Sequence, residues 1–148
     1  MILISACLAG IPCRMDGQSK ECPGFRELVE RGEAVMACPE VLGGLPTPRP
    51  RSEKRGDQVI SERGEDVTAY FEAGAQKALA LYREKGCTLA VLKSKSPSCG
   101  LGRIHAGSFD GRMTDGNGVF ADLLLKEGIP VTDELHFSGA GTGKVNSE

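Results

Sequence analysis

Three cysteines of this chain lie at positions from which their thiols could form one site. The chain has six cysteines, and Cys7, Cys38 and Cys99 each lie at or just after the end of a short apolar run. In an open parallel sheet, ligands bind outside the carboxyl ends of the strands, where the loops gather. If these runs are neighbouring strands, we expect the three thiols to converge on one site. Thiolates are the ligands that soft metals prefer, so the pattern predicts a metal centre.

Polar residues flank two of these cysteines. Glu40 lies two residues after Cys38, and the sequence Ser96-Pro-Ser-Cys-Gly100 places two hydroxyl groups beside Cys99. Lys93 and Lys95 precede the same cysteine, and positive charges of this kind lower the pKa of a nearby thiol. We therefore expect these lysines to favour the thiolate form that a metal requires.

A structural role for the cysteines is the alternative, because a cysteine at a strand end is more often a small buried residue than a ligand. We assign that role to Cys22, which precedes a proline, and to Cys87, which follows a helix end. Cys13 stays open as a fourth ligand, a resolving thiol or neither. The chain has no Cys-x-x-Cys pair, which gives a zinc ribbon or a thioredoxin-type motif little support.

The bulk composition is that of an ordinary globular protein. The 148 residues suffice for one domain with a core, and 40% are hydrophobic and 26% charged. The net charge of -2 argues against an extended nucleic-acid surface. No apolar run approaches the roughly 20 residues of a membrane span. The first residues also lack the basic region and length of a secretion signal. We expect a cytoplasmic protein, in which structural disulfides are disfavoured.

Strands and helices alternate along the chain. Short apolar runs predict strands at 2–7, 34–38, 88–92 and 129–132, with a minor strand at 59–60. Helical spacing predicts helices over 25–31, from 67 to the glycine at 86, and from 119 to the glycine at 128. This order predicts one α/β domain over residues 1–137, with three layers and a mostly parallel, Rossmann-like or flavodoxin-like sheet. Residues 138–148 are expected to form a disordered tail.

Several motifs carry a resemblance to a known family. They are Cys7-Leu-Ala-Gly10, Cys38-Pro-Glu-Val-Leu-Gly-Gly-Leu-Pro-Thr-Pro-Arg49, Ser96-Pro-Ser-Cys-Gly100 and Gly107-Ser-Phe-Asp-Gly111. Together they resemble the small bacterial thiouracil desulfurase family, long labelled a domain of unknown function. The resemblance runs from residue 2 to about residue 132. The long block that starts at Cys38 is the most specific of the motifs.

The resemblance implies a cofactor, a reaction and a set of site residues. It implies a [4Fe–4S] cluster that Cys7, Cys38 and Cys99 hold, with one iron open to the sulfur of the substrate. The implied reaction is the non-redox conversion of thiouracil to uracil and hydrosulfide. Glu40 and Ser96 are the implied acid–base residues beside the cluster. The partner is a small thiolated nucleobase, and neither a membrane nor an oligomeric state is implied.

Further residues are candidates for contact with the substrate. They are Arg14, Asp16, Arg49 and Ser98. The chain has Met15 where this family usually has an aromatic residue, which would alter stacking on the substrate. Two other functions fit the same thiols: a non-catalytic metal or cluster sensor or carrier, and a redox enzyme with an exchangeable thiol pair.

Overall fold

A parallel sheet of four strands forms the centre of the protein. The computed structural model describes residues 1–11, 16–17, 22 and 24–137. The strands are β1 (Ile2–Ser5), β2 (Ala34–Ala37), β5 (Leu89–Leu92) and β8 (Val131–Asp133). They lie in the order β2-β1-β5-β8, and every neighbouring pair is parallel. The α/β class and the parallel sheet predicted from the sequence are confirmed.

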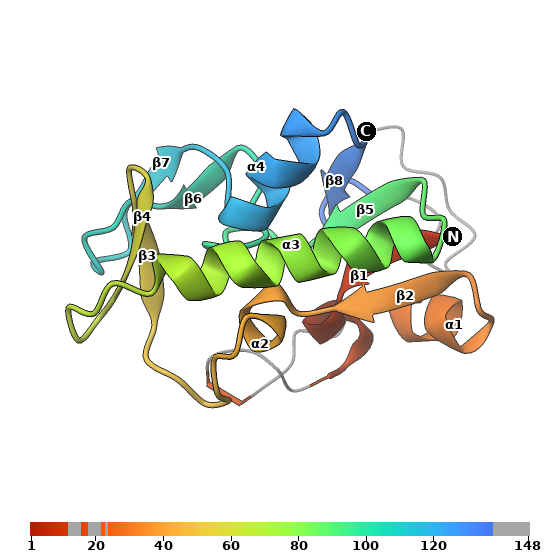
Figure 1. The fold of residues 1–148 in the computed structure, drawn as a ribbon, viewed down its shortest axis with the longest axis horizontal. Coiled ribbons are helices and arrows are strands. Elements are labelled where there is room, and N and C mark those ends of the chain that lie inside the picture. Colours follow the sequence, from red (N-terminus) through yellow and green to blue (C-terminus); the bar gives the residue numbers. More distant parts are fainter. Residues whose placement is uncertain (12–15, 18–21, 23, 138–148) are drawn as a thin grey trace.

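Helices cover both faces of this sheet. On one face, α3 (Thr68–Glu84) and α4 (Val119–Lys126) pack over the sheet, and Figure 1 shows the long α3 running across it. On the other face, α1 (Phe25–Glu30) and the 3-10 turn η1 (Ala6–Ala9) close a second core cluster. Adjacent strand residues point to opposite faces, so Leu3 enters the first cluster and Ile4 the second. The sheet therefore has a three-layer architecture.

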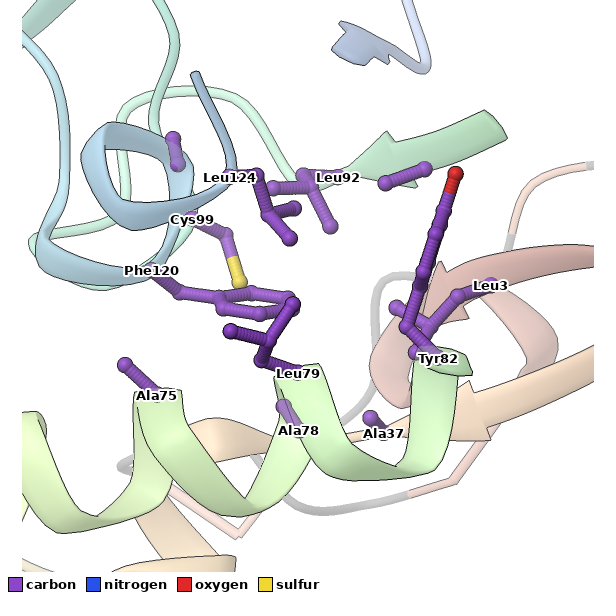
Figure 2. Packing of buried hydrophobic residues seen from close by; sticks show 12 residues of the cluster. Leu3, Ala37, Ala75, Ala78, Leu79, Tyr82, Leu92, Cys99, Phe120 and Leu124 are labelled. Carbon is purple, nitrogen blue, oxygen red and sulfur yellow. The ribbon is translucent and has the colours of Figure 1, made fainter. Parts of the chain in front are cut away.

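The larger core cluster joins the sheet to the candidate site. Leu79 of α3 pairs with Phe120 and Leu124 of α4, and the side chain of Cys99 packs among them (Figure 2). Phe120 and Leu124 are fully buried. Cys99 thus lies at the boundary between the apolar core and the loops at the end of the sheet.

Two hairpins and one short helix lie outside the sheet. The elements are α2 (Pro39–Leu42), β3 (Ser52–Arg55), β4 (Gln58–Ser61), β6 (Arg103–His105) and β7 (Met113–Asp115). Both hairpins are antiparallel. The sequence predicted only a minor strand at 59–60 in this part of the chain. Of the hairpin residues, Val59 joins Phe71 of α3 in a small buried cluster, and this contact attaches β4 to the rest of the protein.

Close contact between two glycines brings α2 onto α3. A Cβ atom at Gly74 would lie 1.7 Å from the carbonyl oxygen of Pro39, and one at Gly43 would lie 1.9 Å from that of Tyr70. Only glycine permits backbones to approach this closely. The contact fixes the position of α2 at the end of the sheet.

No helix within the described residues is long and apolar enough to cross a membrane. The tail predicted for residues 138–148 lies outside the described part of the chain.

Candidate active site

A cavity of about 610 Å³ lies at the carboxyl edge of the parallel sheet. Its lining includes a residue at or just beyond the end of each strand: Ser5, Ala37, Lys93 and Glu134. The strand order places β1 and β5 side by side, although β2 comes between them in the chain. This is the position at which open α/β sheets bind ligands. The fold therefore puts the cavity where the sequence placed the site.

The three predicted cysteines line this one cavity. Cys7 lies in η1, Cys38 lies between β2 and α2, and Cys99 lies in the loop after β5. Cys7 and Cys38 belong to one small apolar cluster, and the charge of Cys38 acts on Cys99. Three segments that are distant in sequence thus bring their thiols together.

Burial dominates the chemistry of Cys99. Removal from solvent is the main reason that the pKa of its thiol is raised to about 12, and the charges of Cys38 and Glu40 raise this pKa further. A hydrogen bond with the Ser5 hydroxyl acts in the opposite direction and lowers the pKa. The prediction that neighbouring lysines lower the thiol pKa is wrong for this residue, because burial outweighs any such effect. Without a metal, Cys99 stays protonated at neutral pH, and a bound soft cation would replace that proton.

The two predicted acid–base residues also line the cavity. Glu40 lies in the first turn of α2, where its Oε1 accepts a hydrogen bond of 2.9 Å from Nε of Arg49. The side chain of Arg49 is only 4% exposed, and its Nη1 also donates to the Pro46 carbonyl and the Thr47 hydroxyl. Arg49 also lines the cavity, so its predicted contact with the substrate stays a prediction beside its bond to Glu40.

Ser96 has an unusual set of hydrogen bonds. Its Oγ accepts the backbone N–H groups of Ser98 and Cys99, both at 3.0 Å. Two accepted bonds occupy both lone pairs of a hydroxyl, so its hydrogen remains as the group to donate. Ser96 therefore shapes the turn that carries Cys99 and presents a hydrogen-bond donor on the cavity wall.

An ion pair that the sequence did not predict lies beside the Ser96 loop. Oε1 of Glu134 accepts the Ser94 N–H at 2.8 Å, and Oε2 accepts the Ser94 hydroxyl at 2.7 Å. Nζ of Lys93 lies 3.3 Å from the same carboxylate. These contacts hold the start of the loop after β5 to the end of β8.

The remaining predicted residues lie away from the cavity or outside the described chain. Ser98 is 1% exposed and Asp16 is exposed, and neither lines the cavity. The contacts of Ser98 and Asp16 with the substrate stay predictions, and Ser98 would reach the cavity only if the turn that buries it moved. Arg14, Cys13 and Met15 lie outside the described residues.

The cavity lining also includes residues that were not predicted as site residues, among them Cys22, Glu53 and His105. Cys22 was interpreted as a packing residue because a proline follows it, and it does also pack against the second core cluster. Glu53 lies on a hairpin strand of mixed charge, so no local pattern marked it. Glu53 and His105 both lie on hairpin strands, so a prediction of the two hairpins would have been needed to bring them to the site.

The donor set suits a centre larger than a single ion. Within the described residues, no group of three or more His, Cys, Asp or Glu side chains could hold one metal ion. Three thiols nevertheless line one cavity of about 610 Å³. Cysteine thiolates are the usual ligands of iron–sulfur clusters, which spread their ligands over several metal atoms. The residues present therefore fit such a cluster better than a mononuclear site.

Comparison with known proteins gives consistent matches over nearly the whole chain. The sequence model of a family described as 2-thiouracil desulfurase matches residues 2–136. The uncharacterized protein YbbK of Bacillus subtilis (strain 168) is 42% identical over 144 residues, which are 90% of this chain and 95% of the relative. A solved structure, the [4Fe-4S]-dependent thiouracil desulfidase TudS, is similar with a TM-score of 0.88 and 48% identity, covering 92% of this chain and 91% of that one.

Proposed function

Because this chain belongs to the 2-thiouracil desulfurase family, we propose that its cavity removes the sulfur of thiouracil with the help of a [4Fe–4S] cluster. Water supplies the oxygen that replaces sulfur on the ring carbon, and its two hydrogens leave with the sulfur. The products are uracil and hydrogen sulfide, and no electrons are gained or lost overall. The observation that carries the proposal is the convergence of three thiols with a carboxylate and a hydroxyl on one cavity.

Cys7, Cys38 and Cys99 are the residues that would hold the cluster. When bound, a cluster with three protein ligands supplies an iron that can act as a Lewis acid toward the thiocarbonyl sulfur. The protein contributes the remaining chemistry through residues that line the same cavity. Cys99 places its sulfur at the floor of that cavity, against the apolar core.

Glu40 is the residue proposed to take a proton from water or from the ring. Its carboxylate lines the cavity, and Arg49 holds one oxygen at 2.9 Å. This bond fixes the carboxylate plane, so that the other oxygen can receive a proton in a constant direction. Such general base catalysis contributes roughly 10²- to 10⁴-fold to a rate.

Ser96 is proposed to donate a hydrogen bond rather than to accept one. Its two lone pairs are occupied by backbone N–H groups, which leaves the hydroxyl hydrogen for the substrate or the departing sulfur. This role is narrower than the acid–base role that the resemblance implies for Ser96.

Anaerobic iron and sulfide analysis, with a thiouracil turnover assay on the same sample, tests the proposal. We expect iron and sulfide in cluster proportion, together with formation of uracil. Glu40→Gln should keep the iron and lose turnover by roughly 10²-fold or more. Glu72→Gln, at an exposed site on α3, is the matched control.

Each other result has a definite meaning in this experiment. Iron-loaded protein without turnover would support a sensor or carrier in place of an enzyme. Full activity in Glu40→Gln would remove that residue from the mechanism. We also propose a cytoplasmic location, because a reducing compartment keeps cysteines available as cluster ligands.

A further inference from the structure

A buried carboxylate on the hairpin side of the cavity has no role in the proposed reaction. Glu53 of β3 is 4% exposed and lines the cavity. Its Oε1 accepts the backbone N–H of Gly107 at 2.8 Å and that of Phe109 at 3.1 Å. These two bonds fix the direction of the carboxylate and tie the loop after β6 to the first hairpin.

The second oxygen of this carboxylate faces the cavity. Within the described residues, Oε2 of Glu53 takes part in no hydrogen bond or ion pair. The polar atoms that are both unpaired and fully buried there are Ser98 Oγ and His105 Nδ1, and Oε2 is not among them. Oε2 therefore keeps some accessible surface. Because the residue is otherwise buried and lines the cavity, that surface belongs to the cavity. A carboxylate oxygen in such a place needs a donor, since a buried charge is costly without hydrogen bonds.

His105 adds a second observation in the same cavity. It lies at the end of β6 and also lines the cavity. Its Nδ1 is a buried atom without a hydrogen-bond partner in the described part of the chain. Nδ1 has almost no accessible surface, so a molecule in the cavity cannot bond it in this orientation of the ring, and His105 contributes here to the cavity wall beside Glu53.

We propose that Oε2 of Glu53 accepts a hydrogen bond from a ring N–H of the thiopyrimidine and so determines which thiolated bases are substrates. The proposal rests on the proposed function, because it names the group that recognises the same substrate. An ionised carboxylate only accepts hydrogen bonds, whereas thiouracil carries an N–H on each side of its C2 thiocarbonyl. A site built to bind a substrate N–H discriminates strongly against analogues that lack it. Glu53 is thus a specificity-determining residue, distinct from Glu40.

Glu53→Gln is the variant that tests this role. Glutamine keeps Oε1 as the acceptor for Gly107 and Phe109, so the loop is retained, but it turns Oε2 into an N–H₂ donor that opposes the substrate N–H. With 2-thiouracil, we expect kcat/KM to fall by roughly tenfold or more, mainly through KM, while the iron content is unchanged. Glu65→Gln, an exposed charge change after the same hairpin, is the control.

Methylated substrates separate recognition from general damage to the site. Wild type and Glu53→Gln are compared on 2-thiouracil, 1-methyl-2-thiouracil and 3-methyl-2-thiouracil. The analogue that lacks the recognised N–H should be a poor substrate for both proteins. With that analogue, wild type and Glu53→Gln should have the same kcat/KM. An equal effect of the substitution on all three compounds would overturn the proposal.

Binding of uracil to the apoprotein supplies a readout that needs no cluster. Isothermal titration should show that Glu53→Gln weakens uracil binding by roughly tenfold or more, and that Glu65→Gln leaves it unchanged. If Glu53→Gln does not fold, wild type alone still tests the idea, because N-methylation of uracil at the recognised position should abolish binding. If methylation at neither nitrogen weakens binding of uracil, the proposed hydrogen bond to Glu53 is contradicted. Absence of turnover by iron-loaded wild type would instead count against the proposed function.

Discussion

The two sides of the cavity differ in how the protein builds them. On one side, the ends of β1, β2 and β5 carry the cysteines, and these strands are buried between two layers of helices. On the other side, β3 and β6 carry Glu53 and His105, and both strands belong to small hairpins outside the main sheet. The proposed cofactor ligands are thus attached to the core, and the proposed recognition residue, Glu53, to its periphery.

The forces that hold the two sides differ in the same way. Leu3, Ile4 and Leu92 of the parallel sheet are fully buried, so burial of apolar area stabilises the cysteine side. The first hairpin contacts the rest of the protein through one small apolar cluster and through hydrogen bonds. Lys54 Nζ donates to the Asn117 carbonyl at 2.8 Å, and Arg55 Nε donates to the Gly107 carbonyl at 2.6 Å. Regions with few buried contacts open at lower free energy. Substitutions on the hairpin side should therefore alter substrate binding without loss of the cluster.

The largest effect is expected on the cysteine side. Serine at Cys7, Cys38 or Cys99 should lower both iron content and turnover by roughly a hundredfold or more, because direct ligands matter more than the residues that support them. Cys87→Ser is the matched control, since Cys87 packs against the core and does not line the cavity. Iron analysis and the turnover assay measure both quantities. If all three variants retained their iron, these cysteines would not be the cluster ligands.

Replacement of Ser96 should have the next largest effect. Ser96→Ala removes the donor on the cavity wall, so kcat should fall by roughly 10²-fold while iron content changes little. Ser96→Thr retains a hydroxyl and should recover part of the rate. Steady-state kinetics on iron-matched samples give the answer. An unchanged kcat in Ser96→Ala would leave the residue with only its part in the turn of Cys99.

A core substitution on the hairpin side sharpens the comparison of the two sides. Val59→Ala, at a fully buried residue of β4, should lower the free energy of unfolding by roughly 1–3 kcal/mol. Hydrogen exchange should increase in β3 and β4 and stay low in β5, KM should rise, and iron content should stay constant. Val41→Ala, at a valine that is 42% exposed, is the control. Loss of iron in step with the loss of stability would show that the two sides are not independent.

The smallest effect concerns the ion pair beside the Ser96 loop. Burial alone would raise the pKa of Glu134, but the hydrogen bonds from Ser94 and the charge of Lys93 outweigh it and lower the pKa below the ordinary 4.5. A lowered pKa in the folded state means that the ionised form stabilises the fold above the ordinary pKa, and that this contribution is lost as pH falls through the lowered value.

Glu134→Gln should therefore be less stable than wild type by about 1 kcal/mol at neutral pH, and the difference should shrink in acid. Denaturant unfolding at neutral pH and below pH 4 measures the difference in stability. A difference that stays the same at both pH values would exclude the carboxylate charge as its cause.

The sequence predicted the cysteine side better than the hairpin side, for physical reasons. Buried parallel strands are short continuous apolar runs, and their carboxyl ends meet at one edge, so Cys7 and Cys38 could be assigned to a common place from pattern alone. The strand Ser52–Arg55 is mostly charged and forms only because it pairs with Gln58–Ser61. Tertiary pairing of this kind leaves little local signal.

Individual side chains were predicted less well than the loops that carry them. The motif around Cys99 marked both Ser96 and Ser98, but only the turn geometry decides that Ser96 lines the cavity and Ser98 lies inside the protein. Likewise, the sequence shows Arg49 without revealing that Glu40 is its partner. Such pairings depend on where α2 docks, which the glycine contact at Gly74 determines.

Mössbauer spectroscopy of protein reconstituted with ⁵⁷Fe under anaerobic conditions tests the central claim most directly. If three thiolates from three loops hold the cluster, one iron site should differ from the others in wild type, and Cys99→Ser should lose the signal. A cluster whose irons are all equivalent, or one that survives loss of Cys7, Cys38 and Cys99 together, would contradict the account.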